Sequence, residues 1–212
     1  MNKLVRRLAT ELRTRGPAGF LRFVGLRLAQ WRGDVLFELD LQQISTTQQV
    51  AQHGPLVQVD RHTLGSGAAQ AVEQAVLTEV NHAYREDLRG EGQLFALTDA
   101  QGQVTSYGFV LFDSFYKRIL GEARSTPMIS NCYTLPAQRG QGLYPCLIQS
   151  ACRQLAAQGY QRAIITCAPD NAASIRGIEK AGFRRVKTLY SLVLVTRWIA
   201  LQKRVSSPDS HA

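Results

Sequence analysis

The sequence predicts an α/β (α+β) fold with a mixed sheet and helices on its faces. Strand and helix patterns alternate through the second half of the chain, after an earlier strand, helix and hairpin. The composition is globular, with 45% hydrophobic and 19% charged residues. A length of 212 residues suits one domain of ordinary size.

The positive charge is concentrated at the start of the chain. Residues 1–32 hold eight basic side chains and one acidic one, which is a net charge of +7 out of +9 for the whole chain. Apolar residues recur there at four-residue steps on both sides of a Gly-Pro break: Leu4, Leu8, Leu12, Phe20, Val24 and Leu28. We therefore predict a basic amphipathic helical extension over 1–32, a domain over 33–205 and a flexible tail over 206–212.

Two surroundings suit this extension. Arginine-rich faces opposite Leu, Phe and Trp are typical of helices that lie on an anionic membrane surface. The same apolar stripe also suits packing on the rest of the domain or on a second subunit, with the arginines in water, and this is the simpler interpretation. A nucleic-acid partner is disfavoured because no aromatic stacking platform accompanies the charge.

The sequence shows no recognisable secretory signal, and its cysteine usage suits a reducing compartment. We therefore predict a cytoplasmic protein, which would be peripheral at the inner membrane face if the extension binds lipid. No apolar run reaches the length of a transmembrane helix, and Arg and Glu interrupt the runs that a secretory signal would need. The cysteines form no C-x-x-C pair and adjoin no histidine cluster, so we predict buried thiols and no metal site. They are Cys132, Cys146, Cys152 and Cys167.

The remaining elements are predicted in order from periodicity and turn residues. Four-residue apolar steps predict helices over 68–86 and 142–158, and Gly159 and Gly182 are well placed to end helices. A hairpin is predicted where 94–97 and 104–112 flank a polar turn. Further strands are expected over 34–40, 56–63, 127–135, 163–167 and 183–198, the last as one or two strands, with a helix over 171–181.

The segment 135–148, LPAQRGQGLYPCLI, carries the most informative motif. A strand end is followed by a loop with Gly140 and Gly142 and then by a helix start. The glycines let the backbone approach a ligand, and the helix start adds partial positive charge. Pro145 in the first turn costs no hydrogen bond. The loop is predicted to bind an anion such as a pyrophosphate, although it is neither a Walker loop nor a dinucleotide fingerprint.

A second motif, NAASIRGIEKAGF, follows over 171–183. Together with P-x-x-R-G-x-G before the first helix, it resembles the GNAT superfamily of acyl-CoA-dependent N-acetyltransferases. The resemblance is tight over 126–190, looser over 56–125 and absent from 1–32, and the RGQGLYP loop looks like that of envelope-polysaccharide pathway members. It implies a mostly antiparallel sheet in which the strands 127–135 and 163–167 splay apart and admit a pantetheine arm.

The resemblance also implies how acetyl-CoA, the cosubstrate, would be held. Asn171 would hydrogen-bond the pantetheine arm, Ser174 would lie near the phosphates, and an amide within 131–133, ending at Tyr133, would polarise the thioester carbonyl. From the residues alone, Asn171 is also a helix cap and Arg139 a solvated charge. The loop residues that would surround the pyrophosphate are Gln138, Arg139, Gly140, Gln141, Gly142 and Leu143.

Two positions depart from the family pattern. Ala137 stands where Gln or Arg is frequent, which matters little because the other loop contacts are to backbone. Ile178 stands where many members carry a Tyr that protonates the departing thiolate. Tyr133, Tyr144 or a water would then serve, although core packing is the simpler interpretation of both tyrosines. Alternatively the protein binds acyl-CoA with weak or no catalysis. Loss of the acid need not abolish transfer, however, because a thiol with a pKa of about 8.5 needs little help in leaving.

No general base is assigned, and no metal is expected. The strand 127–135 holds neither Asp nor Glu, and Glu79, His82 and Asp113 are remote candidates. The expected reaction is direct attack of a primary amine on acetyl-CoA in a ternary complex. The favoured acceptor is a small molecule, either an amino sugar or a nucleotide-linked amino sugar, and a protein or peptide amine is the alternative.

Overall fold

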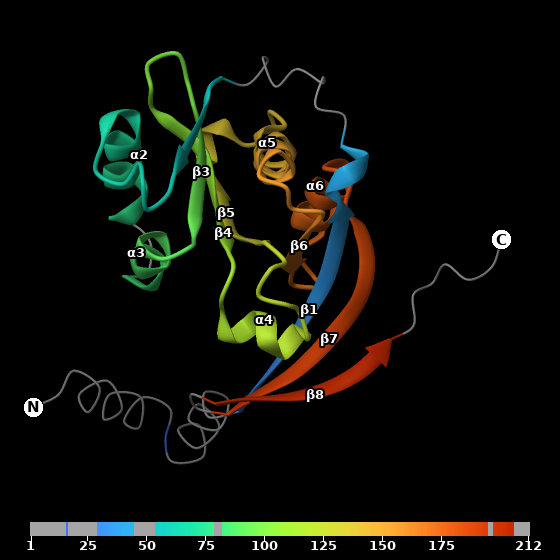
Figure 1. The fold of residues 1–212 in the computed structure, drawn as a ribbon. Coiled ribbons are helices and arrows are strands. Elements are labelled where there is room, and N and C mark those ends of the chain that lie inside the picture. The colour runs from blue at the N-terminus through green and yellow to red at the C-terminus, as the bar shows by residue number, and fades with distance from the viewer. Residues whose placement is uncertain (1–15, 17–28, 45–53, 79–81, 195–196, 206–212) are drawn as a thin grey trace, which may run out of the picture. The chain divides into compact units, whose positions relative to one another are not determined.

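The computed structural model describes residues 16, 29–44, 54–78, 82–194 and 197–205 (Figure 1). The chain falls into two compact units. The larger unit comprises Val35–Lys187 and Ser206–Ala212, and the smaller comprises Met1–Asp34 and Thr188–Val205. Both sequence motifs lie in the larger unit.

The larger unit is built on a mixed sheet with the strand order β2-β3-β4-β5-β6-β1-β7. β5 and β6 run parallel, whereas the pairs β2–β3, β3–β4, β4–β5 and β6–β1 are antiparallel. The predicted mixed, mostly antiparallel sheet is therefore confirmed. The strands are β1 Ala29–Asp40, β2 Leu56–Val59, β3 Gln93–Thr98, β4 Val104–Leu111, β5 Met128–Thr134, β6 Arg162–Cys167 and β7 Arg184–Leu194, of which β1 and β7 continue into the smaller unit.

β5 and β6 separate after a short paired stretch. They pair at Met128↔Ile164 and at the next position along both strands. β6 nevertheless pairs with β1 over its whole length, from Arg162 to Cys167. Residues 130–134 of β5 thus run without a partner on the β6 side, and the predicted splayed strand pair is confirmed.

A bulge bends β5 where the strands part. The register with β4 places two residues, Asn131 and Cys132, opposite the single residue Gly108. Asn131 takes a φ of 46°, a conformation that Asn tolerates better than most residues. Gly108 leaves room for the Cys132 side chain, because an added Cβ would lie 2.7 Å from Cys132 Sγ. The bulge thus combines an Asn at positive φ in one strand with a Gly opposite it in the neighbouring strand.

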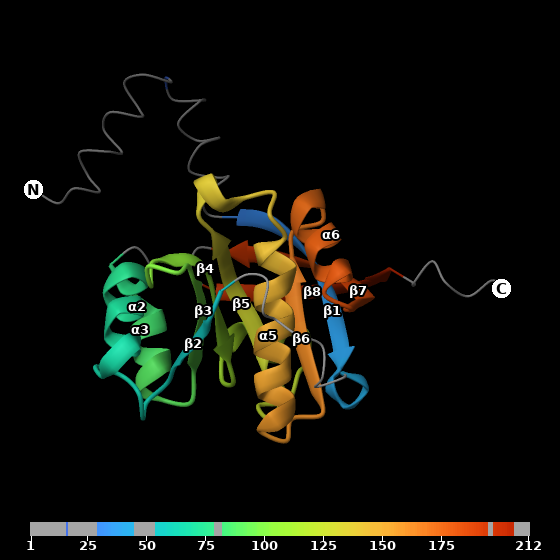
Figure 2. The same cartoon turned by 90° about the horizontal axis from the view of Figure 1, so that it is seen from above.

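Helices cover both faces of the sheet (Figures 1 and 2). α2 and α3 lie on one face of the sheet, over β3 and β4. On the other face α5 lies over β3, β4 and β5, and α6 lies beside α5 against β6. Leu147 of α5 and Ile178 of α6 belong to the same buried core as Phe95 of β3 and Val110 of β4. The helices are α2 Gly67–Leu77, α3 His82–Arg89, α4 Phe115–Leu120, α5 Leu143–Ala157 and α6 Ala172–Lys180, with 3-10 turns η1 Leu41–Gln43 and η2 Pro136–Gln138.

Three elements differ from the prediction. β2 ends at Val59, because the Asp60 carboxylate accepts hydrogen bonds from the amides of His62 and Thr63 at 2.9 and 3.1 Å and turns the chain. The helix predicted over 68–86 is two helices, α2 and α3, and residues 79–81 lie outside the described part. α4 has six residues, too few to give a helical period in the sequence.

A buried lysine fastens α4 to its flanking segments. Lys117 is 1% exposed, and its ammonium donates to the backbone oxygens of Phe112 at 2.6 Å, of Arg124 at 3.0 Å and of Thr126. Burial lowers the pKa of this ammonium. Its three donors are all used, so the side chain ties the end of β4 to the start of β5.

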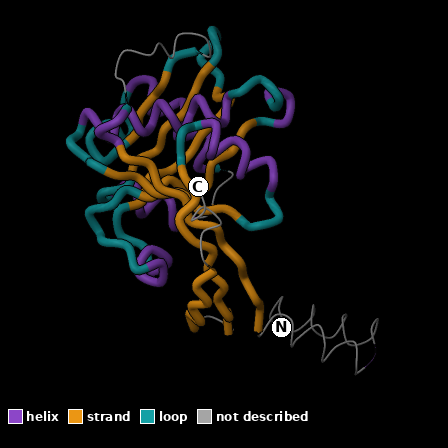
Figure 3. Tube along the Cα trace, turned by 90° about the vertical axis from the view of Figure 1, so that its right-hand side faces the viewer, coloured by secondary structure: helices purple, strands orange, loops and turns teal. Residues whose placement is uncertain are grey.

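The smaller unit contains a β-hairpin (Figure 3). β7 pairs antiparallel with β8, Arg197–Val205. The region 183–198, predicted as one or two strands, therefore contains β7 and the start of β8. Ser191 Oγ donates to Arg32 O at 3.5 Å, and residues 29–32 form the start of β1. The prediction of helix at 29–32 is therefore wrong, because this backbone hydrogen-bonds as a strand.

The rest of the predicted N-terminal extension, Gly16 excepted, lies outside the described residues, as does the predicted tail 206–212. Any surface or subunit that the extension contacts stays a prediction. Within the described ranges, no helix has both the length and the apolar character needed to cross a bilayer.

Candidate functional site

The loop after β5 leads through η2 into α5. Gly140 and Gly142 take φ values of 81° and 76°, which lie in the left-handed region that favours glycine. An added Cβ at Gly140 would meet nothing within 4 Å. The backbone conformation, and not crowding by protein atoms, therefore requires this glycine, and the space beside it is open.

The amide groups at the turn find no acceptor among the residues that the structure describes. The hydrogen bonds of the loop stop with Arg139 N, which donates to Pro136 O, and those of α5 begin with Cys146 N, which donates to Gly142 O. Gly142 caps α5 without a side-chain hydrogen bond. Such amides, together with the positive end of the helix, attract an anion. Among the described residues, no acceptor faces the amides of Gly140, Gln141, Gly142, Leu143 and Tyr144.

α6 begins at the same edge of the sheet as α5, because β5 and β6 are parallel and each leads into a helix at its carboxyl end. Asn171 caps α6 by accepting a hydrogen bond from Ser174 N at 3.1 Å. The side chain is exposed, and its Nδ2 group donates to no described residue. Asn171 is thus both a cap and a possible donor to a ligand.

Tyr144 of α5 packs tightly on α6. A Cβ added at Gly177 would lie 2.3 Å from Tyr144 Cδ1, so the ring lies directly against the helix backbone. Tyr144 packs against the same buried core as Cys132 of β5 and Cys167 of β6. It therefore lies on the side of the splayed strands that α5 and α6 cover.

The Tyr144 hydroxyl stays protonated. Burial raises the pKa of Tyr144, the neighbouring thiols raise it further, and a side-chain hydrogen bond with Ser174 acts in the opposite direction. A neutral phenol at this place is a proton donor at physiological pH.

Cys132 is not a nucleophile at neutral pH. Burial raises the pKa of its thiol to about 12. Because the thiolate is the reactive form, this residue is unsuited to carry an acyl group.

Tyr133 faces the other side of the sheet. Cys132 packs against the core beneath α5, and neighbouring side chains of a strand point to opposite faces. The Tyr133 ring is 38% exposed, and the Arg139 guanidinium carbon lies 5.6 Å from its centre. Arg139 is therefore positioned over Tyr133 and not beside α6.

Ile178 and the remote base candidates lie away from the opening or outside the described part. Ile178 is 0% exposed and packs in the core beneath α5. Asp113 follows β4 at the edge where β5 starts, and it pairs with Arg124 at 3.2 Å, so it is at the wrong end of the sheet to act as a base. Glu79 lies outside the described residues, and only the backbone of His82 is described.

Comparison with known proteins decides the family. Residues 62–183 match the acetyltransferase (GNAT) family, which is more than half of the chain. The chain belongs to this family. No curated protein matches the chain.

Two solved structures share the fold of this GNAT domain. An acetyltransferase from the GNAT family of Colwellia psychrerythraea is 12% identical, with a TM-score of 0.52 over 83% of this chain and 62% of that one. A GCN5-related N-acetyltransferase-like protein from Streptococcus suis is 14% identical, with a TM-score of 0.51 over 84% of this chain and 67% of that one. At such identities the likeness shows the fold. The chain spans less than two thirds of the length of the Colwellia protein.

Two glycines of the GNAT domain shape the site without having been predicted. Gly177 admits the Tyr144 ring, and Gly108 admits the Cys132 thiol beside the bulge. Each is an isolated glycine inside an otherwise regular helix or strand, which is the sequence signal of a close approach.

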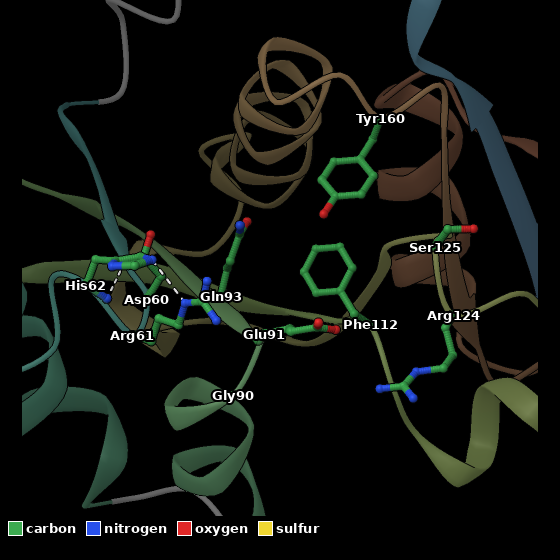
Figure 4. A pocket seen from close by; sticks show the side chains of 11 residues that line it. Asp60, Arg61, His62, Gly90, Glu91, Gln93, Phe112, Arg124, Ser125 and Tyr160 are labelled. Atoms are coloured by element: carbon green, nitrogen blue, oxygen red, sulfur yellow. Dashed lines mark hydrogen bonds between the residues drawn. The ribbon is translucent and has the colours of Figure 1, made fainter.

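A separate cavity of about 550 Å³ opens at the opposite edge of the GNAT sheet (Figure 4). Phe112 and Tyr160, whose ring centres lie 5.2 Å apart, form part of its wall together with the exposed Arg61. This edge holds the end of β4 and the start of β5, so the cavity is not part of the site around Gly140. Within the described part of the chain, no three His, Cys, Asp or Glu side chains are grouped to hold a metal ion.

Proposed function

We propose that this GNAT domain transfers an acetyl group from acetyl-CoA to the primary amine of a small acceptor. The observation that carries the proposal is the row of amides from Gly140 to Tyr144, for which the described part of the chain offers no acceptor, beside the opening between β5 and β6. The pyrophosphate of acetyl-CoA would supply those acceptors. The pantetheine arm would enter along residues 130–134, where β5 has no partner on that side.

The reaction would proceed by direct attack in a ternary complex. The neutral amine attacks the thioester carbonyl carbon, a C–N bond forms, and an amide of residues 131–133 stabilises the oxyanion. The C–S bond then breaks. The nitrogen, which became positively charged when the C–N bond formed, loses one proton to water and leaves a neutral amide. Positioning supplies much of the rate, because the thioester is already activated.

Tyr144 would protonate the departing thiolate. Its side chain packs against the same core as Cys132 of β5 and Cys167 of β6, and its raised pKa keeps the proton on the oxygen until the thiolate departs. Tyr144 then regains a proton from water. Tyr133, the other hydroxyl predicted for this task, projects to the opposite face and is the weaker choice.

The acceptor is proposed to be an amino sugar, free or linked to a nucleotide. The support is the RGQGLYP loop, which resembles that of acetyltransferases in envelope-polysaccharide pathways. An acyl-CoA-binding protein with weak or no catalysis is the alternative, and Ile178 in place of a hydroxyl is the observation that favours it.

The decisive experiment measures thiol release from acetyl-CoA with amino sugars, nucleotide-linked amino sugars, polyamines and a peptide amine, alongside calorimetric titration of acetyl-CoA. Binding together with amine-dependent release supports acetyl transfer. Binding without release from any amine supports the acyl-CoA-binding alternative. Release with the peptide alone contradicts the acceptor class, and absence of binding contradicts the whole proposal.

A further inference from the structure

Four aromatic rings form a continuous row on the sheet face that α3 covers. The ring centres of Tyr84 and Phe109 lie 4.4 Å apart, those of Phe109 and Tyr107 6.2 Å, and those of Tyr107 and Tyr133 5.6 Å. Phe109 is 1% exposed, whereas Tyr133 is 38% exposed. The row therefore runs from the core to the surface and ends on the part of β5 that has separated from β6.

Arg139 extends this row by a positive charge. Its guanidinium carbon lies 5.6 Å from the centre of the Tyr133 ring, and Nε donates to Thr134 O at 3.2 Å. The side chain is exposed, and it pairs with no carboxylate of the described residues. With Nε anchored, the two Nη groups are the donors that remain for a ligand.

The ring and the guanidinium stand at the reacting end of β5. Cys132, the neighbour of Tyr133, packs together with Tyr144 against the core on the α5 side. A molecule stacked on Tyr133 would thus approach the opening from the face opposite to the α5 core. Its amine would reach a thioester held between the strands without displacing the loop amides.

We propose that Tyr133 and Arg139 form the acceptor subsite, and that the acceptor is an amine on a ring that also carries a phosphate group, such as an amino sugar phosphate, free or within a nucleotide. This inference rests on the proposed function. The apolar face of the sugar contacts the exposed part of the Tyr133 ring, and the phosphate oxygens accept from the Nη groups of Arg139, which lies over the same ring. The charge of Arg139 disfavours polycationic amines. The family resemblance implies that Arg139 lies beside the pyrophosphate of acetyl-CoA. In this proposal Arg139 binds the acceptor instead.

The test is steady-state thiol release by the full chain with glucosamine and with its 1- and 6-phosphates. We expect kcat/KM for a phosphate to exceed that for glucosamine by about tenfold or more, the gain of one charge-assisted hydrogen-bond pair. Arg139→Gln is expected to abolish this preference and to leave KM for acetyl-CoA within about twofold. Arg61→Gln, which removes an exposed arginine at the opposite edge of the sheet, is the matched control and should alter neither constant.

Tyr133 variants test the stacking part. Tyr133→Leu is expected to raise KM for the sugar phosphate about tenfold, whereas Tyr133→Phe keeps the ring and should stay near the parent value. Calorimetric binding of acetyl-CoA reports that each variant is folded.

Three outcomes overturn the inference. They are a preference for glucosamine over its phosphates, a phosphate preference that survives Arg139→Gln, and an increase of KM for acetyl-CoA in place of the acceptor effect. In each of these the proposed function stands, because acetyl transfer still occurs. Absence of thiol release with every amine overturns both.

Discussion

α5 and α6 start at the same edge of the sheet and treat their first amides in opposite ways. α6 carries its own acceptor, since Asn171 Oδ1 accepts from Ser174 N. α5 starts at Gly142, which has no side chain to offer, and the amides around it find no acceptor among the described residues. Both helices follow parallel strands, but α5 is reached through η2 and a glycine loop that ends at Gly142, whereas α6 begins at Asn171.

The contrast teaches how to separate a structural helix start from a binding one. A capped start is complete without a ligand, because the protein satisfies the donors that helix geometry exposes. A glycine start in the left-handed region leaves the same donors open, and an anion can complete it. The variants below exchange or remove these features, and they are ordered from the largest expected effect to the smallest.

Gly142→Asp should have the largest effect, because it gives α5 a capping side chain of its own. The carboxylate would accept from the open amides and repel the pyrophosphate by about 3 kcal/mol at an effective dielectric of about 20. We expect the Kd for acetyl-CoA to rise about 100-fold. Gly142→Asn is the matched control, because Asn also tolerates a positive φ and caps helices but carries no charge. Equal losses in both variants would contradict a charge effect.

Gly177→Ala should disturb the contact between the two helices. The new Cβ would lie 2.3 Å from Tyr144 Cδ1, so the ring must leave its place. Overpacking of this kind lowers the free energy of unfolding by about 1–3 kcal/mol, and we expect kcat to fall by more than tenfold. Thermal unfolding and thiol release measure both. In a double-mutant cycle, Gly177→Ala should cost little stability in a Tyr144→Ala background, while kcat stays low; an equal cost in both backgrounds would contradict the packing argument.

Tyr144→Phe removes the proton donor and keeps the ring. Because a thiolate leaves readily, we expect kcat to fall only about tenfold, with KM for acetyl-CoA unchanged. The raised pKa of Tyr144 means that the parent enzyme keeps this proton as the pH rises to 9, so its kcat should show no alkaline decline from this group. A pH–rate profile of kcat checks the point. Unchanged kcat in the variant would assign the proton to water.

Asn171→Ala should give the smallest effect. Loss of the cap on α6 lowers the free energy of unfolding by about 1 kcal/mol, as measured by denaturant titration. If Asn171 also donates to the pantetheine arm, KM for acetyl-CoA should rise about threefold to tenfold, the value of one neutral hydrogen bond. Asn171→Ser, which keeps a capping oxygen, separates the two roles: stability should return while KM stays raised.

The parts of the site that local chemistry specifies were predictable from the sequence. Gly140 and Gly142 belong to a strand–loop–helix motif whose conformation depends on neighbouring residues. The same holds for Asn171 as a cap and for the hairpin between β3 and β4. The splayed strands followed from the family resemblance and not from periodicity.

The positions of several side chains relative to the site depend on packing between distant parts of the chain, and local sequence patterns could not predict them. The place of Tyr144 depends on Gly177 far along the chain, and the side of the sheet on which Tyr133 and Arg139 meet depends on a bulge. Asp113 fell at the wrong edge because strand direction, not sequence distance, sets its position. Residues 29–32 follow directly on a helical spacing that ends at Leu28, yet they form the start of β1, which lies next to β7 in the sheet.

The Lys117 ammonium acts as an organic counterpart of a coordinated cation. It gathers three carbonyl oxygens from two segments, much as a structural calcium ion gathers backbone oxygens from a loop. Unlike an ion, it is covalently part of the chain and cannot be chelated away. It is also an amine that an acetylating protein cannot modify, since its hydrogens are all engaged and it is 1% exposed. The cross-link that orders the start of β5 is thereby protected from the acetyl donor that the proposed reaction consumes.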